Sequence, residues 1–173
     1  MNPRKLARRT GAIVLVLTLM LAALVAWLNV RGEVPLEAGG PAAPASSEVI
    51  GRGAYLARAG NCMGCHTTTG GAEFAGGRGV DTPFGIVVAP NITPDSRTGI
   101  GNWSASEFWR SLHHGRSKDG RLLYPAFPYP SFTQVSREDS DALYAFLRSV
   151  PAVERANAPH ALRFPYSTQA ALA

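Results

Sequence analysis

The chain has 173 residues with 17 Lys and Arg against 12 Asp and Glu, a formal net charge of +5. This length suits one domain with extensions, and 46% hydrophobic and 9% aromatic residues exclude a wholly disordered chain. Four of the basic residues lie within the first nine positions, so the chain from Arg31 onward is close to neutral. Because no basic face is indicated, we expect no nucleic-acid partner.

An uncharged run from Gly11 to Leu28 follows these basic residues. About 20 apolar residues cross a bilayer as one helix, and preceding positive charges favour a cytoplasmic N-terminus. A cleaved signal peptide is the alternative, although its apolar region is usually shorter, roughly 7–15 residues. We favour a retained anchor over residues 1–31, with the remainder exported. Residues 32–47, rich in Pro, Gly and Ser, are predicted to form a flexible linker.

Three helices are predicted after the linker, two of them from sharp boundary signals. Ser104 with Glu107 three residues later is a capping box, and Gly115 is a typical helix end. Apolar residues recur at helical spacing before Pro151, which cannot continue a helix. The helices are expected from about Glu48 to Gly60, from Ser104 to Gly115 and from Ser136 to Pro151.

The stretch 67–101 between the first two helices is rich in glycine, and only 86–88 resembles a strand. A long loop without secondary structure argues against a compact domain unless something organises it from within. This pattern indicates a large prosthetic group in the core.

The segment Cys62-Met63-Gly64-Cys65-His66 has the spacing of a c-type haem attachment site. Two thiols about one helical turn apart can each bond one vinyl group on the same edge of a porphyrin, and the next imidazole then reaches the iron. We predict one haem c per chain, covalently bound through Cys62 and Cys65. His66 would be the proximal iron ligand, with its other ring nitrogen donating to a backbone carbonyl.

Three other uses of this cysteine pair explain the sequence less well. A structural zinc site needs four ligands, and no second cysteine pair exists. A redox Cys-x-x-Cys motif normally lies in a sheet-and-helix setting, whereas we expect hardly any strand here. A plain disulfide would explain neither His66 nor the irregular loops.

Several segments outside the motif strengthen this interpretation, and the chain from about Glu48 to Val153 resembles a class I cytochrome c domain. It is most similar to the domains of membrane-bound multihaem cytochrome c subunits that serve periplasmic dehydrogenases of the alcohol and aldehyde type. The segments are Gly51–Leu56, Thr82–Gly85, Asn91–Asp95, Thr98–Gly101, Asp119–Gly120, Tyr124–Tyr129 and Asp141–Leu147.

The resemblance implies an all-α, cytochrome c-like domain over residues 48–153, wrapped around one covalently bound haem and preceded by a single transmembrane helix. In this fold Gly51 and Tyr55 of the first helix would cross Leu143 and Phe146 of the last. Residues 154–173 would be a C-terminal extension or a truncated linker to another domain.

The resemblance also implies an electron carrier rather than an enzyme. It would take single electrons from a periplasmic dehydrogenase and pass them to a downstream respiratory acceptor. The chain would lie at the bacterial inner membrane, with its soluble domain in the periplasm.

The distal side of the haem departs from the family pattern. In the alcohol dehydrogenase subunits a Tyr-Pro-Ala-Met-Pro-Tyr loop carries the distal methionine, and here Phe127 stands at that position. His113 and His114 are candidate ligands, although both could simply lie at a helix C-terminus with favourable dipole interactions. An open iron would allow a different function, that of a haem-based small-ligand sensor or a peroxide-reducing enzyme.

Overall fold

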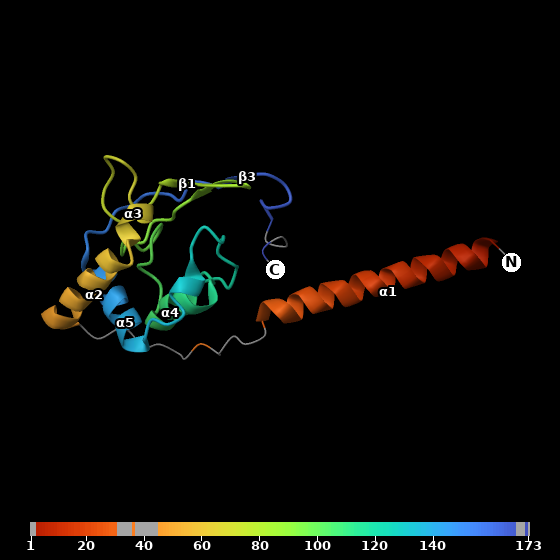
Figure 1. Ribbon diagram of the computed structural model, residues 1–173, viewed down its shortest axis with the longest axis horizontal. Helices are drawn as coiled ribbons and strands as arrows, with labels where there is room; N and C mark the ends of the chain where they lie inside the picture. Colours follow the sequence, from red (N-terminus) through yellow and green to blue (C-terminus); the bar gives the residue numbers. More distant parts are fainter. Residues whose placement is uncertain (1–2, 31–35, 37–44, 169–171, 173) are drawn as a thin grey trace. The chain divides into compact units, whose positions relative to one another are not determined.

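The computed structural model describes residues 3–30, 36, 45–168 and 172. The described chain forms two separate units, one containing helix α1 (Pro3–Val30) and the other containing all further elements (Figure 1). Among the described residues, α1 is the helix long and apolar enough to cross a membrane. Its most apolar stretch, within Pro3–Trp27, has a mean hydropathy of 2.4 and is not buried. Most of the expected linker, residues 32–47, lies outside the described residues.

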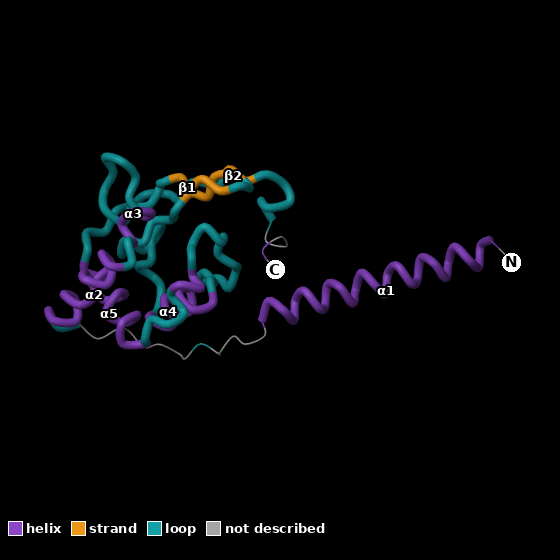
Figure 2. Tube along the Cα trace, viewed as in Figure 1, coloured by secondary structure: helices purple, strands orange, loops and turns teal. Residues whose placement is uncertain are grey.

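The second unit contains all three helices expected after the linker, and Figure 2 shows how much of it is loop. Ser46 and Ser136 cap two of these helices through their side chains. The elements are α2 (Ser47–Ala59), α3 (Cys62–His66), β1 (Gly79–Thr82), β2 (Gly85–Val88), α4 (Ala105–His114), the 3₁₀ helix η1 (Tyr129–Ser131), α5 (Arg137–Ser149) and β3 (Ala161–Leu162).

Helices α2 and α5 cross at Gly53. A Cβ atom at this position would overlap the carbonyl oxygen of Ala142 and lie 2.7 Å from the Cβ atom of Phe146. The expected crossing through Gly51 and Tyr55 is therefore wrong, because a Cβ atom on Gly51 would meet nothing within 4 Å and Tyr55 is 64% exposed. The buried face of α2 lies two positions further along the helix than the sequence interpretation placed it.

The hydrophobic core lies between α2, α4 and α5. Two loops each contribute one further side chain to it. Leu147 of α5 is only 1% exposed, and Ala57 of α2 is 2% exposed. Phe74 and Ile100 reach the core from the irregular stretch between α3 and α4. We call this set the core cluster: Ala57, Phe74, Ile100, Phe108, Leu112, Leu143, Tyr144 and Leu147.

A three-stranded antiparallel sheet, whose strands are orange in Figure 2, has the order β1-β2-β3. Strands β1 and β2 form a hairpin in which Gly79 lies opposite Val88. Strand β3 pairs with β2, with Ile86 opposite Ala161. The expectation of an all-α fold is wrong on this point: the regular structure of this unit is mainly helical but includes a small sheet. Its strands are too short to produce a clear alternating pattern, and β3 comes from the distant C-terminal segment.

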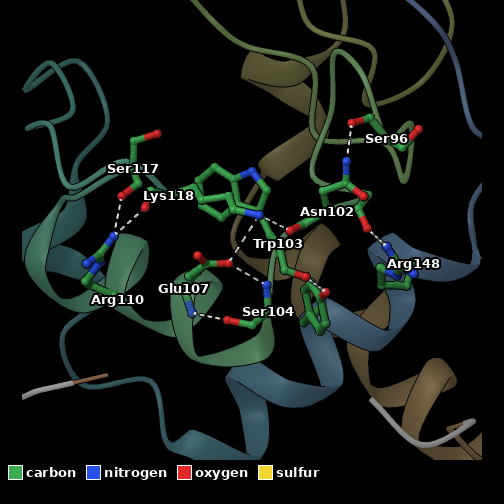
Figure 3. Close-up of polar contacts among 11 residues, drawn as sticks. Ser96, Asn102, Trp103, Ser104, Glu107, Arg110, Ser117, Lys118 and Arg148 are labelled. Carbon is green, nitrogen blue, oxygen red and sulfur yellow. Dashed lines mark hydrogen bonds and ion pairs between the residues drawn. The ribbon is translucent and has the colours of Figure 1, made fainter. Parts of the chain in front are cut away.

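The predicted capping box of α4 is confirmed (Figure 3). The Glu107 backbone nitrogen donates to the Ser104 hydroxyl at 3.1 Å, and the Ser104 nitrogen donates to the Glu107 carboxylate at 2.7 Å. The loop after α4 folds back on the same helix, because Arg110 donates to the carbonyl oxygens of Ser117 and Lys118. Hydrogen bonds therefore join helix α4 to the first part of the loop that follows it.

The Gly53 crossing gives a prediction about stability. Gly53→Ala should lower the free energy of unfolding by about 1–3 kcal/mol, because the new methyl group forces α2 away from the backbone of α5. Gly51→Ala on the same helix is the control, and it should raise stability by roughly 0.5–1 kcal/mol through higher helix propensity. Chemical denaturation of the purified protein followed by circular dichroism measures both. Equal effects of the two substitutions would contradict the crossing described.

Candidate functional site

The cysteines of the attachment motif lie on the short helix α3, directly after α2. Asn61 adopts a left-handed conformation, φ 51°, which turns the chain between the two helices. Cys62 and Cys65 are free thiols less than one helical turn apart. Cys62 packs against the core cluster, whereas Cys65 is exposed. In this arrangement both sulfur atoms could bond to the same edge of a planar ring system, with the rest of the ring system buried in the protein.

His66 ends α3, and its ring is oriented by a backbone carbonyl, as predicted. Its Nδ1 atom donates to the carbonyl oxygen of Pro90 at 2.8 Å. Burial lowers the pKa of His66, more than the hydrogen bond to Pro90 raises it, so the neutral ring is favoured. A neutral ring with its proton on Nδ1 presents an Nε2 lone pair, which is the form that binds metals.

Pro90 is held by the side chain of the next residue, Asn91, which is 3% exposed. The Nδ2 atom of Asn91 donates to the Thr98 hydroxyl at 3.0 Å and to the Val153 carbonyl at 2.8 Å. Its Oδ1 atom accepts from the backbone nitrogen and hydroxyl of Thr93, which is fully buried. The sequence interpretation noted Asn91 as part of a family resemblance but assigned it no role.

Asp95 accepts hydrogen bonds from two nearby residues of the same loop. One of its carboxylate oxygens accepts from the backbone nitrogen and the hydroxyl of Thr98, both at 2.7 Å, and from the nitrogen of Arg97 at 3.1 Å. The hydrogen bonds from Thr98 hold the pKa of Asp95 below its ordinary value. Asp95 therefore fixes the position of Thr98, the residue that also supports Asn91.

Phe127 lies where the family pattern has a methionine, and it packs against the core cluster. Its ring stacks on Phe132, with ring centroids 5.4 Å apart and planes 12° apart. The chain has three methionines, of which Met63 alone lies beyond α1, on the exposed surface of α3. Hence the position at which the family pattern has its methionine carries an aromatic side chain that is packed against a second one.

The structure places His113 and His114 in different surroundings at the end of α4. The His113 ring stacks on Trp109 with centroids 3.9 Å apart. Its Nδ1 lies 3.1 Å from the Trp109 carbonyl oxygen, and its Nε2 lies 2.9 Å from the Val135 carbonyl oxygen. Each ring nitrogen of His113 thus lies within hydrogen-bond distance of a backbone carbonyl, and a neutral ring donates to one of the two at a time. His114 is half-buried and meets the same tryptophan edge-on, with centroids 5.6 Å apart.

The geometry around the cysteines fits haem better than a zinc ion. Within the part of the chain that the structure describes, no three His, Cys, Asp or Glu side chains gather so that they could hold a metal ion. Cys62, Cys65 and His66 instead supply two thiols and one oriented imidazole on a single short helix. That set matches covalent attachment of haem with histidine ligation.

Comparison with known sequences agrees with this site. The profile of the cytochrome c family matches residues 50–151, and the chain belongs to this family. Membership implies haem c as the cofactor.

Three relatives illustrate the similarity. The chain is 47% identical over 130 residues to the gluconate 2-dehydrogenase cytochrome c subunit of Pantoea cypripedii, covering 75% of this chain and 30% of that protein. It is 43% identical over 124 residues to the cytochrome c subunit of alcohol dehydrogenase (quinone) of Gluconacetobacter polyoxogenes, covering 71% and 26%. It is 36% identical over 167 residues to a diheme cytochrome c-type protein of Cereibacter sphaeroides, covering 92% and 54%. The resemblance to cytochrome c subunits of dehydrogenases is confirmed, and the chain spans at most about half of these relatives' length.

The lowered pKa of Asp95 gives a prediction about pH. An acid whose pKa is lower in the folded state stabilises the fold above its unfolded value of about 3.9, and this stabilisation is lost as the pH falls through the folded value. Asp95→Asn does not titrate and accepts weaker hydrogen bonds. The difference in free energy of unfolding between wild type and variant should therefore be constant above about pH 5 and shrink below about pH 4.

Denaturation curves measured at several pH values test this expectation. Asp81→Asn, on strand β1, is a suitable control for the loss of one carboxylate. A difference that stays constant down to pH 2 would contradict the role assigned to the Asp95 carboxylate.

Proposed function

We propose that this chain is a single-electron carrier that binds one haem c through Cys62 and Cys65. The observation that carries the proposal is the orientation of His66 by Pro90 on the helix that also holds both thiols. His66 is the proximal iron ligand. The haem, when bound, supplies the one-electron change between ferric and ferrous iron.

The protein's own groups prepare the site for this chemistry. The Pro90 carbonyl keeps the proton of His66 on Nδ1, so that Nε2 is the nitrogen that would bind the iron. Phe127 and Phe132 pack against the core cluster, as Cys62 does. These apolar side chains would limit the access of water to a haem bound at Cys62. A dry, apolar surrounding is one of the factors that set the potential of a haem.

The electron donor is a periplasmic dehydrogenase, and the acceptor is a downstream respiratory component. The names of the relatives support this assignment, since these proteins are cytochrome c subunits of gluconate and alcohol dehydrogenases. Helix α1 anchors the chain in the bacterial inner membrane and leaves the second unit in the periplasm. Its length, its hydropathy of 2.4 and the basic residues at its start support the anchor.

One observation favours a second function: Phe127 stands at the position of the distal methionine. An iron without a strong sixth ligand could bind a small gas or reduce a peroxide, which would make the protein a sensor or an enzyme. The contacts of His113 with two backbone carbonyls argue against its ligating the iron in this conformation. His114 remains the histidine candidate at the end of α4.

The first experiment tests attachment. Acid–acetone extraction of wild-type protein should leave the haem on the polypeptide, and the pyridine spectrum should show two saturated vinyl groups. Cys62→Ala and Cys65→Ala should each lose most of the holoprotein. His66→Ala should do the same or leave an abnormal spectrum, because the iron loses its protein ligand. Met63→Leu, within the same helix, is the control and should behave as wild type. Free haem in the wild-type extract would disprove the proposal.

The second experiment tests the distal side. The ferric wild type should lack the weak far-red charge-transfer band that methionine ligation gives in related cytochromes. Phe127→Met should create the band and raise the reduction potential, because a thioether ligand favours the ferrous state. Phe132→Met, at the stacked neighbour, is the control and should create no band.

The same spectra separate the two functions. A reversible one-electron titration with slow binding of carbon monoxide supports the electron carrier, whereas rapid binding supports the sensor or enzyme. A high-spin spectrum for His114→Ala, with an unchanged spectrum for His113→Ala, would identify His114 as the ligand. A far-red methionine band in the wild type would contradict the prediction for Phe127.

A further inference from the structure

The peptide group that joins Pro90 to Asn91 makes a hydrogen bond at each end. Its carbonyl oxygen accepts from Nδ1 of His66 at 2.8 Å. Its N–H group donates to the side-chain oxygen of Asn157 at 2.7 Å. Asn157 is thus one planar peptide away from the proximal histidine, although it lies far along the chain, after α5.

Asn157 is held in place by a second contact and by its neighbours. Its Nδ2 atom donates to the Thr98 carbonyl oxygen at 3.0 Å. Two further hydrogen bonds join the same stretch of chain to the Pro90 loop: Arg155 donates from its backbone nitrogen to the Thr98 hydroxyl at 3.0 Å, and Val153 accepts from Asn91 at 2.8 Å. Residues 153–157 therefore run along the loop that carries Pro90.

The two hydrogen bonds of this peptide group act on each other. When the N–H of a peptide donates, the group is polarised and its carbonyl becomes a better acceptor. A better acceptor draws more strongly on the Nδ1 proton of His66 and makes Nε2 a more basic ligand. Hydrogen bonds to an iron-binding side chain are among the factors that tune the potential of haem iron.

We propose that Asn157 is a positioning residue for the proximal ligand, acting on His66 through the Pro90–Asn91 peptide and lowering the reduction potential of the haem. The proposal rests on the proposed function, because it needs His66 on the iron. It assigns a role to the segment after α5, which lies outside the matched range 50–151. Asn157 is itself exposed, so its substitution does not disturb the core.

The test compares two substitutions of Asn157. Both remove its hydrogen bond to Thr98, but only one also removes the oxygen that accepts from Asn91. Asn157→Leu removes the oxygen that accepts from Asn91, and Asn157→Asp keeps an oxygen there with a full negative charge. Both lose the hydrogen bond to Thr98. A merely structural role predicts shifts in the same direction, whereas the proposed role predicts a higher potential for Asn157→Leu and an equal or lower one for Asn157→Asp.

Asn102 offers matched controls on the same loop. Its side chain donates to the Ser96 carbonyl at 2.8 Å (Figure 3), whereas the described hydrogen bonds of the Pro90–Asn91 peptide go to His66 and Asn157. Asn102→Leu controls for the loss of an asparagine contact, and Asn102→Asp controls for the added charge. Both should shift the potential less than the matching change at Asn157.

Redox titration of the full-length holoprotein in detergent measures the effect. For Asn157→Leu we expect the ferrous form to gain about threefold over the ferric form, roughly 28 mV for a one-electron couple. Ring-proton signals of His66 in the cyanide-bound ferric protein should also move in this variant and stay in place in Asn102→Leu. If Asn157→Leu gives too little holoprotein, Asn157→Ala removes the same oxygen and should shift the potential in the same direction.

The outcomes separate this inference from the proposed function. A wild type without covalent haem defeats the proposed function before any variant is compared. Holoprotein in which Asn157→Leu has an unchanged or lower potential overturns the role of Asn157 alone. A rise in potential for both Asn157 variants also overturns it, since that result reflects only the loosened loop.

Discussion

The hydrogen bond from Nδ1 of His66 to the Pro90 carbonyl is the contact on which the rest of the site depends. It joins the helix that carries the cysteines to a loop 24 residues away, and it decides which ring nitrogen is left for a metal. The thiols and the imidazole are adjacent in sequence and need little from the fold. The Pro90 carbonyl, in contrast, comes from a distant part of the chain. The loop that contains Pro90 must therefore hold this carbonyl in a fixed position.

That loop is rigid without regular secondary structure because polar side chains replace the missing backbone partners. A buried backbone group without a partner is costly. Asn91, Thr93 and Asp95 satisfy their neighbours through short side chains. The segment after α5 then covers the loop from outside. A fold with a small apolar core can therefore still hold one carbonyl oxygen in place.

The two sides of the site place different demands on the chain. The cysteines, His66 and Pro90 form an arrangement that suits haem attachment in the cytochrome c family. Where the family pattern has a methionine, Phe127 stacks on Phe132 instead. The attachment motif and the residue at the methionine position are therefore separate parts of the chain, and one can change without the other.

The sequence alone determined what depends on neighbouring residues: the attachment motif at Cys62–His66, the capping box of Ser104 and Glu107, and the helices α2, α4 and α5. Each follows from spacing within one or two helical turns. Only the tertiary structure decided which face of α2 meets α5 and that β3 pairs with β2. It also decided that Pro90 accepts a hydrogen bond from His66 and that Asn157 accepts one from the next residue, Asn91. These contacts join residues up to about 90 positions apart, as between Gly53 and Ala142, and local periodicity carries no information on which distant segment will provide a partner.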